Sequence, residues 1–292
     1  MRRGAIVGLI AALAAASAAA DSVPPGLASV QIPVKSTRMN GFMLTASGSG
    51  PHALVVFLHG YPGNERNIDL AQAVRRVGYD ALYFDYRGTW GSGGQFSFAN
   101  ALGDVAAVLA YVRSPEAVAR FHIDPEKIIL LGDSLGGALA LLAAADDPGV
   151  ACVAALSSWD MGAAAWRWSD HPDERNQLED FFWHTTDPES GPVRGNPTAM
   201  IQEIDDSQAD WDLAALAPSI SDRRLLIVSD TWVEQDVRDY HALTDALAQS
   251  GAGPLLRTVT FDDDPVFSAH RAELADLVMD WLGRGCLVPR PS

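Results

Sequence analysis

At the centre of the chain stands Lys127-Ile128-Ile129-Leu130-Leu131-Gly132-Asp133-Ser134-Leu135-Gly136-Gly137, followed by small and apolar residues up to Ala145. The continuous apolar run before Gly132 predicts a strand buried on both faces, and Leu135–Ala145 predicts a helix. Ser134 falls in the turn between them, and the glycines two positions away on either side let strand and helix approach closely. The sequence therefore predicts a strained turn that exposes the Ser134 hydroxyl at the carboxyl edge of a sheet, at the positive end of a helix.

The alternation of strand and helix continues on both sides of this turn. Apolar runs of strand length alternate with helical periods, which predicts an α/β fold: a mostly parallel central sheet with helices on both faces. The other expected strands are 52–59, 80–86, 150–156, 224–229 and 256–261. The other expected helices are 69–78, 102–112, 237–250 and 270–283.

One long interval interrupts this alternation. Residues 158–221 contain no expected strand and hold five of the eight tryptophans. An insertion of this length in a compact domain is usually a lid or a binding element. We therefore expect a cap of short helices whose tryptophans favour an apolar or aromatic substrate group, with plain packing as the alternative role of these side chains.

The first twenty residues have the features of a targeting segment. Two arginines precede an apolar, alanine-rich run that ends in small residues at Ala20. This pattern is typical of a secretory signal peptide over residues 1–20, cleaved after Ala20, with an uncleaved membrane anchor as the alternative. Cleavage leaves no membrane span, so we expect a periplasmic or secreted protein.

Charge and cysteine content exclude several classes of partner. The chain of 292 residues has 21 basic and 37 acidic side chains, a formal net charge of −16. An acidic surface repels phosphate backbones, so we expect no nucleic-acid partner. Cys152 and Cys286 are too few for a disulfide framework or a zinc site, and two unpaired thiols are favoured over a single bridge.

Two further segments extend the pattern around Ser134. His59-Gly60-Tyr61-Pro62-Gly63 ends one expected strand, and Asp85-Tyr86-Arg87-Gly88-Thr89-Trp90-Gly91-Ser92-Gly93-Gly94 ends the next. With these segments the chain resembles the α/β-hydrolase superfamily over about residues 41–283. The resemblance is to the branch of bacterial esterases and of prolyl-oligopeptidase-like or aminopeptidase-like serine hydrolases. It implies one α/β-hydrolase domain over residues 21–292, with the cap inserted at 158–221.

The resemblance also implies a triad in the chain order Ser, Asp or Glu, His. Ser134 is then the nucleophile, and the backbone amides of Tyr61 and Leu135 are expected to form an oxyanion hole. We interpret His59 as a residue that shapes its loop rather than as the general base. No cofactor is needed for this chemistry.

The acid and the base are expected after the last two strands. Asp230 follows the strand 224–229 and is the first choice for the acid, with Glu234 and Asp236 as alternatives. His270 is the only histidine after the last expected strand, 256–261, and is therefore the expected base, whereas His241 falls in an expected helix. Related enzymes often place this histidine as His-x-Phe before the final helix, where this chain has Pro265. We interpret the run 262–264, three aspartates, as a solvated loop and assign no metal.

These residues favour an exported serine hydrolase acting on a small-molecule ester or amide, more strongly an ester than a peptide. A catalytically silent binding protein with the same fold is the main alternative, because both the acid and the base depart from the family pattern. An exopeptidase of the prolyl-oligopeptidase-like type is a third. It needs a carboxylate pair in the cap, and adjacent acidic pairs there include Glu179 with Asp180 and Asp205 with Asp206. The sequence does not indicate an oligomeric state.

Overall fold

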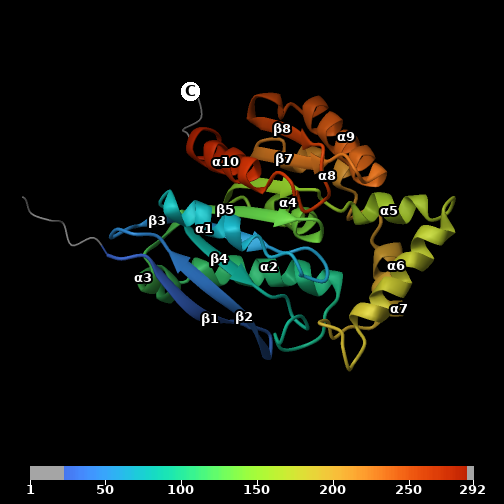
Figure 1. The fold of residues 1–292 in the computed structure, drawn as a ribbon, viewed down its shortest axis with the longest axis horizontal. Coiled ribbons are helices and arrows are strands. Elements are labelled where there is room, and N and C mark those ends of the chain that lie inside the picture. Colours follow the sequence, from blue (N-terminus) through green and yellow to red (C-terminus); the bar gives the residue numbers. More distant parts are fainter. Residues whose placement is uncertain (1–22, 288–292) are drawn as a thin grey trace, which may run out of the picture.

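The computed structural model describes residues 23–287, which form an eight-stranded sheet flanked by helices (Figure 1). The first two strands of the spatial order run antiparallel to their neighbours, and the remaining six are parallel. The predicted mostly parallel α/β fold is confirmed. In spatial order the strands are β1 (Gly26–Val34), β2 (Thr37–Thr45), β4 (Asp80–Phe84), β3 (His52–Leu58), β5 (Ile123–Asp133), β6 (Val150–Leu156), β7 (Arg224–Asp230) and β8 (Leu256–Phe261).

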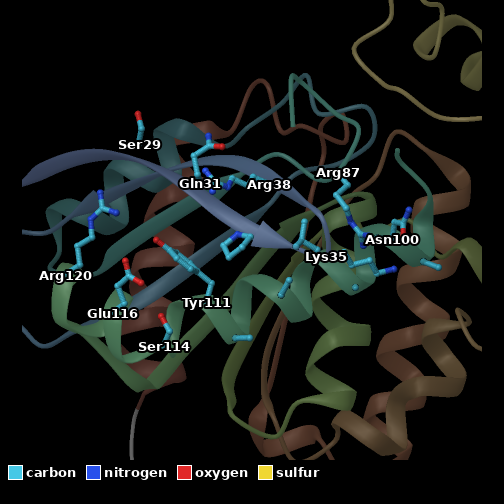
Figure 2. Close-up of a pocket in the computed structure, with 16 residues that line it drawn as sticks. Ser29, Gln31, Lys35, Arg38, Arg87, Asn100, Tyr111, Ser114, Glu116 and Arg120 are labelled. Carbon is cyan, nitrogen blue, oxygen red and sulfur yellow. The ribbon is translucent and has the colours of Figure 1, made fainter. Parts of the chain in front are cut away.

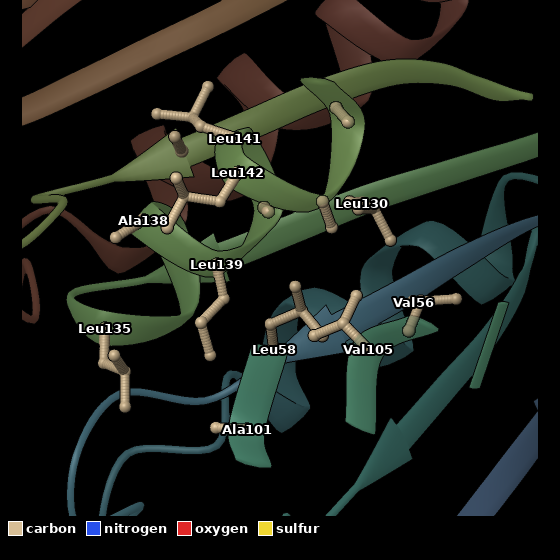
Figure 3. Close-up of a cluster of buried hydrophobic side chains, with 14 of the residues drawn as sticks. Val56, Leu58, Ala101, Val105, Leu130, Leu135, Ala138, Leu139, Leu141 and Leu142 are labelled. Carbon is tan, nitrogen blue, oxygen red and sulfur yellow. The ribbon is translucent and has the colours of Figure 1, made fainter. Parts of the chain in front are cut away.

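Helices cover both faces of the sheet because alternate side chains of each central strand point to opposite sides. In β3, Val56 packs into one apolar cluster and Val55 into the other. Figure 3 shows the larger cluster, in which leucines at the start of α4 pack on β3, β5 and α2. The first face is covered by α2 (Phe98–Val112), α3 (Pro115–Phe121), α4 (Leu135–Asp146), α8 (Leu213–Ile220) and α9 (Glu234–Gln249). The second is covered by α1 (Ile68–Arg76), α10 (Arg271–Trp281) and the short turn η2 (Leu282–Cys286).

The antiparallel hairpin of β1 and β2 lies outside the predicted strands. Its first strand shows a half-buried pattern, since Val30, Ile32 and Val34 face the core while their neighbours face solvent. Continuous apolar runs mark only strands buried on both faces, and this alternation is the sequence signal of the half-buried hairpin.

The interval between β6 and β7 is helical, as the sequence predicts. It contains α5 (Met161–Arg167), α6 (Pro172–Thr185) and α7 (Pro197–Asp206), which lie together beyond the carboxyl ends of the strands, and then α8, which packs against α4 and α9 (Figure 1). Of its tryptophans, Trp168 and Trp211 are buried, whereas Trp166 and Trp183 are more than half exposed.

Cys152 and Cys286 form a disulfide, so the expectation of two unpaired thiols is wrong. Cys152 lies in β6 and Cys286 in η2, 134 residues further along the chain. The bridge forms because the chain after α10 folds back against the face of the sheet to which Cys152 points.

Among residues 23–287, no helix is long and apolar enough to cross a membrane. The predicted signal peptide lies outside the described residues.

Candidate active site

Ser134 occupies the strained turn that the sequence predicts. It stands between the last residue of β5 and the first of α4, with φ 50° and ψ −119°, a conformation that few non-glycine residues adopt. Close packing explains the flanking glycines. A Cβ on Gly132 would lie 2.1 Å from the carbonyl oxygen of Gly136, and one on Gly136 would lie 2.0 Å from that of Leu58. The turn leaves the Ser134 side chain partly accessible to solvent.

The predicted oxyanion donors lie on either side of Ser134. Gly60 packs so closely that a Cβ on it would be 3.1 Å from the Ser134 Cβ, which places the start of the Tyr61 loop against the serine. Leu135 begins α4 directly after Ser134. In the described part of the chain, neither the Tyr61 nor the Leu135 backbone N–H donates a hydrogen bond. Both donors are therefore available to a developing negative charge.

The side chain of Tyr61 ties its loop to helix α6. Its hydroxyl lies 2.5 Å from the Thr185 hydroxyl, and its ring contacts Phe96, Phe181 and Phe182. Burial raises the pKa of Tyr61 to about 12, against the effect of the Thr185 hydrogen bond. Tyr61 therefore remains neutral and serves as a fixed anchor for the loop.

His59 is buried and shapes the same loop, as the sequence analysis proposes. Its Nδ1 lies 2.6 Å from the carbonyl oxygen of Gly60, and its ring packs against Tyr86. Burial lowers the pKa of His59 to about 4, so the ring is neutral and its Nδ1 donates to that carbonyl.

His270 lies at the start of α10 and is held by Asp263, not by the predicted Asp230. The His270 Nδ1 is 2.9 Å from the Asp263 Oδ2, which also accepts the backbone N–H groups of Ala269 and His270. The Asp263 side chain is 1% exposed. Burial opposes its ionisation, but the hydrogen bonds from His270 and the backbone outweigh burial and lower the pKa of Asp263. The pair has the arrangement of a base and the carboxylate that orients it.

The aspartate run 262–264 is therefore not a uniformly solvated loop. Its three carboxylates face different surroundings: Asp262 accepts from Thr231 and Trp232, and Asp264 caps the turn at Val266. Only Asp263 turns inward. Neighbouring aspartates look alike in a sequence, and the fold of the turn over residues 261–270 decides which one meets the imidazole.

Asp230 has a structural role at the end of β7. It is buried, and its Oδ1 accepts the backbone N–H groups of Trp232 and Val233, which shapes the turn into α9. No hydrogen bond or ion pair joins it to His270 within residues 23–287. Of the two alternatives, Glu234 is exposed and Asp236 lies beside Asp230. None of the three carboxylates predicted for the acid contacts the histidine.

Within residues 23–287, no direct hydrogen bond joins the Ser134 hydroxyl to His270. A chain of two side-chain contacts connects their neighbours, however: Asp133 accepts from Asn67 at 2.7 Å, and Asn67 accepts from Arg271 at 3.0 Å. This chain brings the serine turn and the start of α10 to the same edge of the sheet. Hydrogen bonds between catalytic groups are often long without substrate and tighten when it binds.

A cavity of about 330 Å³ lies between α5, α6 and the start of α9, and neither Ser134 nor His270 is among its lining residues. Trp159 donates its backbone N–H to the Ser134 carbonyl oxygen and lines this cavity, as does Phe181, whose ring contacts Tyr61. Its walls combine apolar and aromatic side chains with four ionisable ones. The remaining lining residues are Ala164, Arg167, Trp168, Glu174, Gln177, Leu178, Val233, Gln235, Asp236 and Asp239.

Asp236, in the wall of this cavity, makes stability depend on pH. Burial, followed by the charge of Asp230 and a hydrogen bond to it, raises the pKa of Asp236 to about 8. The unfolded chain releases this proton near pH 4, so the folded state is progressively destabilised as pH rises from about 4 to about 8.

We expect Asp236→Asn to remove this contribution. In the variant, the free energy of unfolding should fall less steeply as pH rises. The difference in slope is at most about 1.4 kcal/mol per pH unit, the slope that one proton contributes. Urea denaturation of the wild type and the variant at pH 5, 6, 7 and 8 measures the difference. Parallel curves for the two proteins would contradict the assignment.

A larger cavity, of about 970 Å³, lies away from these residues, between β1, α2 and α3 (Figure 2). Lys35 and Arg38 line it near the β1–β2 turn, and Arg120 and Glu116 line its other end. None of the residues discussed above as catalytic lines this cavity. Across residues 23–287, no cluster of three or more His, Cys, Asp or Glu side chains is arranged to hold a metal ion.

Residues 53–186 match the family model of the α/β-hydrolase fold. The matched segment includes Tyr61 and Ser134 but ends before Asp263 and His270. With the sheet order and the serine turn, the match shows that the chain has the α/β-hydrolase fold.

Two curated relatives match part of this chain. The quorum-quenching protein AidA of Acinetobacter baumannii is 31% identical over 139 residues, which cover 46% of this chain and 44% of AidA. The uncharacterised protein Rv2307c of Mycobacterium tuberculosis is 32% identical over 131 residues, 44% of each chain. The chain thus aligns with less than half the length of these relatives.

Solved structures match more of the chain at lower identity. Est1E from Butyrivibrio proteoclasticus has a TM-score of 0.60 and 15% identity, covering 88% of this chain and 98% of Est1E. An acylaminoacyl peptidase from Pyrococcus horikoshii has a TM-score of 0.62 and 16% identity, covering 92% of this chain and 43% of the peptidase. These likenesses confirm the α/β-hydrolase fold.

Proposed function

We propose that the chain is an exported serine hydrolase that cleaves a carboxylic ester through an acyl-enzyme on Ser134. The observation that supports this most directly is the contact between His270 and the buried Asp263, at the edge of the sheet where the strained turn presents Ser134. The free N–H groups of Tyr61 and Leu135 complete the set of groups that acyl transfer needs.

In the proposed reaction, the Ser134 oxygen attacks the ester carbonyl and its proton passes to the Nε2 of His270. Asp263 holds the Nδ1 proton and stabilises the imidazolium that forms. The Tyr61 and Leu135 amides bind the oxyanion of the tetrahedral intermediate. Its collapse expels the alcohol, which takes the proton from His270. Water, deprotonated by His270, then attacks the acyl-enzyme, releases the acid and restores the Ser134 hydroxyl.

The cavity lined by Trp159, whose backbone N–H donates to the Ser134 carbonyl oxygen, supports a substrate with an apolar or aromatic group. Trp159, Trp168, Leu178 and Phe181 line it, and its volume of about 330 Å³ suits a group about as large as one or two rings. The exopeptidase alternative has less support. Arg175 contacts both Glu179 and Asp205, so these carboxylates are already paired and do not form a free site for a substrate amino terminus.

Export is part of the proposal. The basic, apolar and small-residue regions of residues 1–20 are those of a secretory signal peptide. The disulfide between Cys152 and Cys286 is the kind of bond that persists in oxidising compartments such as the periplasm. We therefore propose a periplasmic or secreted location for the mature chain.

Labelling with a fluorophosphonate probe tests the proposal, because the probe reacts with activated serines whatever their substrate. We expect the purified wild type to be labelled and both Ser134→Ala and His270→Ala to lose labelling. Ser158→Ala, a nearby serine outside the turn, is the matched control and should still be labelled. Labelling lost only in Ser134→Ala would identify a serine enzyme with a different base. An unlabelled, folded wild type would favour the silent binding protein.

A further inference from the structure

Asp133, the residue before Ser134, is a buried carboxyl that the proposed reaction does not use. Its side chain touches two segments distant in sequence: the Oδ2 accepts the Gly60 backbone N–H at 3.2 Å, and the Oδ1 accepts the Asn67 amide at 2.7 Å. Burial and the charge of Glu65 raise the pKa of Asp133 to about 7, so keeping a carboxyl here is energetically costly. A buried acid at such a position needs a reason beyond packing.

The contacts continue from Asn67 to the segment that holds the histidine. Asn67 caps α1 in the left-handed conformation, with φ 51°, and its Oδ1 accepts from Arg271 at 3.0 Å. Arg271 directly follows His270, and its guanidinium also pairs with Asp69 and donates to the Val266 carbonyl oxygen at 3.0 Å. Arg271 therefore links the start of α10 to Asn67, Asp69 and Val266.

This chain of contacts joins all three parts of the proposed site. Asp133 belongs to the serine turn, Gly60 adjoins the oxyanion donor Tyr61, and Arg271 adjoins His270. A carboxylate suits the central position because it accepts two N–H groups at once, whereas an asparagine accepts with one atom only.

We propose that Asp133 is a positioning residue, which through Gly60, Asn67 and Arg271 sets the oxyanion loop and His270 relative to Ser134. This inference rests on the proposed function. Asp133 is buried and touches no substrate, so its effect is on the alignment of the reacting groups. Misalignment by about 1 Å lowers the rate of an enzyme by about 100-fold without a matching loss of binding.

An exchange of side chains tests the network. In Asp133→Asn, the oxygen of the new side chain can still accept from Gly60. Its NH2 group can donate to the Asn67 oxygen only if Asn67 turns its own NH2 group toward Arg271. The Asn67 NH2 group then faces the Arg271 guanidinium, and both of these groups are donors. In Asn67→Asp, two carboxylates face one another. In the double variant, the amide at position 133 accepts from Gly60 and donates to the carboxylate at position 67. That carboxylate accepts from Arg271, so every hydrogen bond is restored. Aspartate also tolerates the left-handed conformation at position 67.

We expect each single variant to lower kcat for p-nitrophenyl acetate about 10- to 100-fold, with KM changed by less than about threefold. The rate of fluorophosphonate labelling should fall in parallel, and the double variant should recover to within about fivefold of the wild type. Asp80→Asn is the matched control: Asp80 is also fully buried, accepts from the Ala46 N–H, and lies at the far end of the parallel strands. It should change stability and leave kcat unchanged.

Several results would overturn the inference. One is a folded Asp133→Asn with wild-type kcat, and another is a folded double variant that stays as slow as the single ones. The kcat of the double variant tests the inference even where a single variant fails to fold. An unlabelled wild type would overturn the proposed function and this inference with it, whereas a labelled wild type with an unaffected Asp133→Asn would overturn the inference alone.

Discussion

Asp263→Asn is expected to lower kcat of the proposed ester hydrolysis by about 1,000-fold or more, while Asp230→Asn should change it by less than about threefold. Asparagine fills the same space as Asp263 and can still accept the neighbouring backbone N–H groups. It lacks the negative charge that stabilises the imidazolium of His270, and its NH2 group must replace one of the two carboxylate oxygens, which accept from Asp264 and from His270. The loss should therefore appear in kcat, with a smaller change in KM.

Asp230 is the matched comparison because it is equally buried and is the acid expected from sequence. Its Oδ1 accepts two backbone N–H groups in the turn after β7, a task that asparagine also performs. Kinetics with p-nitrophenyl acetate, with circular dichroism to verify folding, separate the two residues. An inactive Asp230→Asn beside an active Asp263→Asn would return the acid to the end of β7.

The second large effect is on stability. Replacing Cys152 and Cys286 together by alanine should lower the free energy of unfolding by about 3–5 kcal/mol, since the bridge closes a loop of 134 residues in the unfolded chain. Both half-cystines are buried, so truncating them also removes packing between β6 and η2. Urea denaturation at neutral pH, with enzyme activity followed in parallel, measures the loss.

Reduction provides the control for this prediction. Dithiothreitol present throughout unfolding should destabilise the wild type by a similar amount and leave the double alanine variant unchanged. Each single variant also lacks the bridge and should lie within about 1 kcal/mol of the double. Equal urea midpoints for the wild type and the double variant would show that the bridge does not contribute to stability.

Much of the site could be predicted because its signals are local. The turn at Ser134 needs only a strand, a helix and glycines at fixed spacing, and these follow one another in the chain. The oxyanion donors Tyr61 and Leu135 are backbone groups, so their positions follow from where the strands end. His270 follows by elimination, because the sequence has one histidine after the last strand, 256–261.

The carboxylate beside His270 could not be predicted in the same way. Asp263 stands between two other aspartates, and its neighbours have the same composition and nearly the same distance from β8. Burial of one side chain among three is decided by how the turn over residues 261–270 closes against the sheet. The same limit applies to Asp133, whose partners Gly60, Asn67 and Arg271 belong to three other segments.

The α/β fold, the serine turn and His270 can be predicted from the sequence alone. They depend on periodicity, glycine spacing and residue counts, which are local properties of the chain. Packing was needed to show that Asp263 holds His270, that Cys152 meets Cys286, and that the helices after β6 place tryptophans both in the core and on an open surface. Each of these findings depends on how segments close against one another in three dimensions, and such contacts form only when the packed sheet brings those segments together.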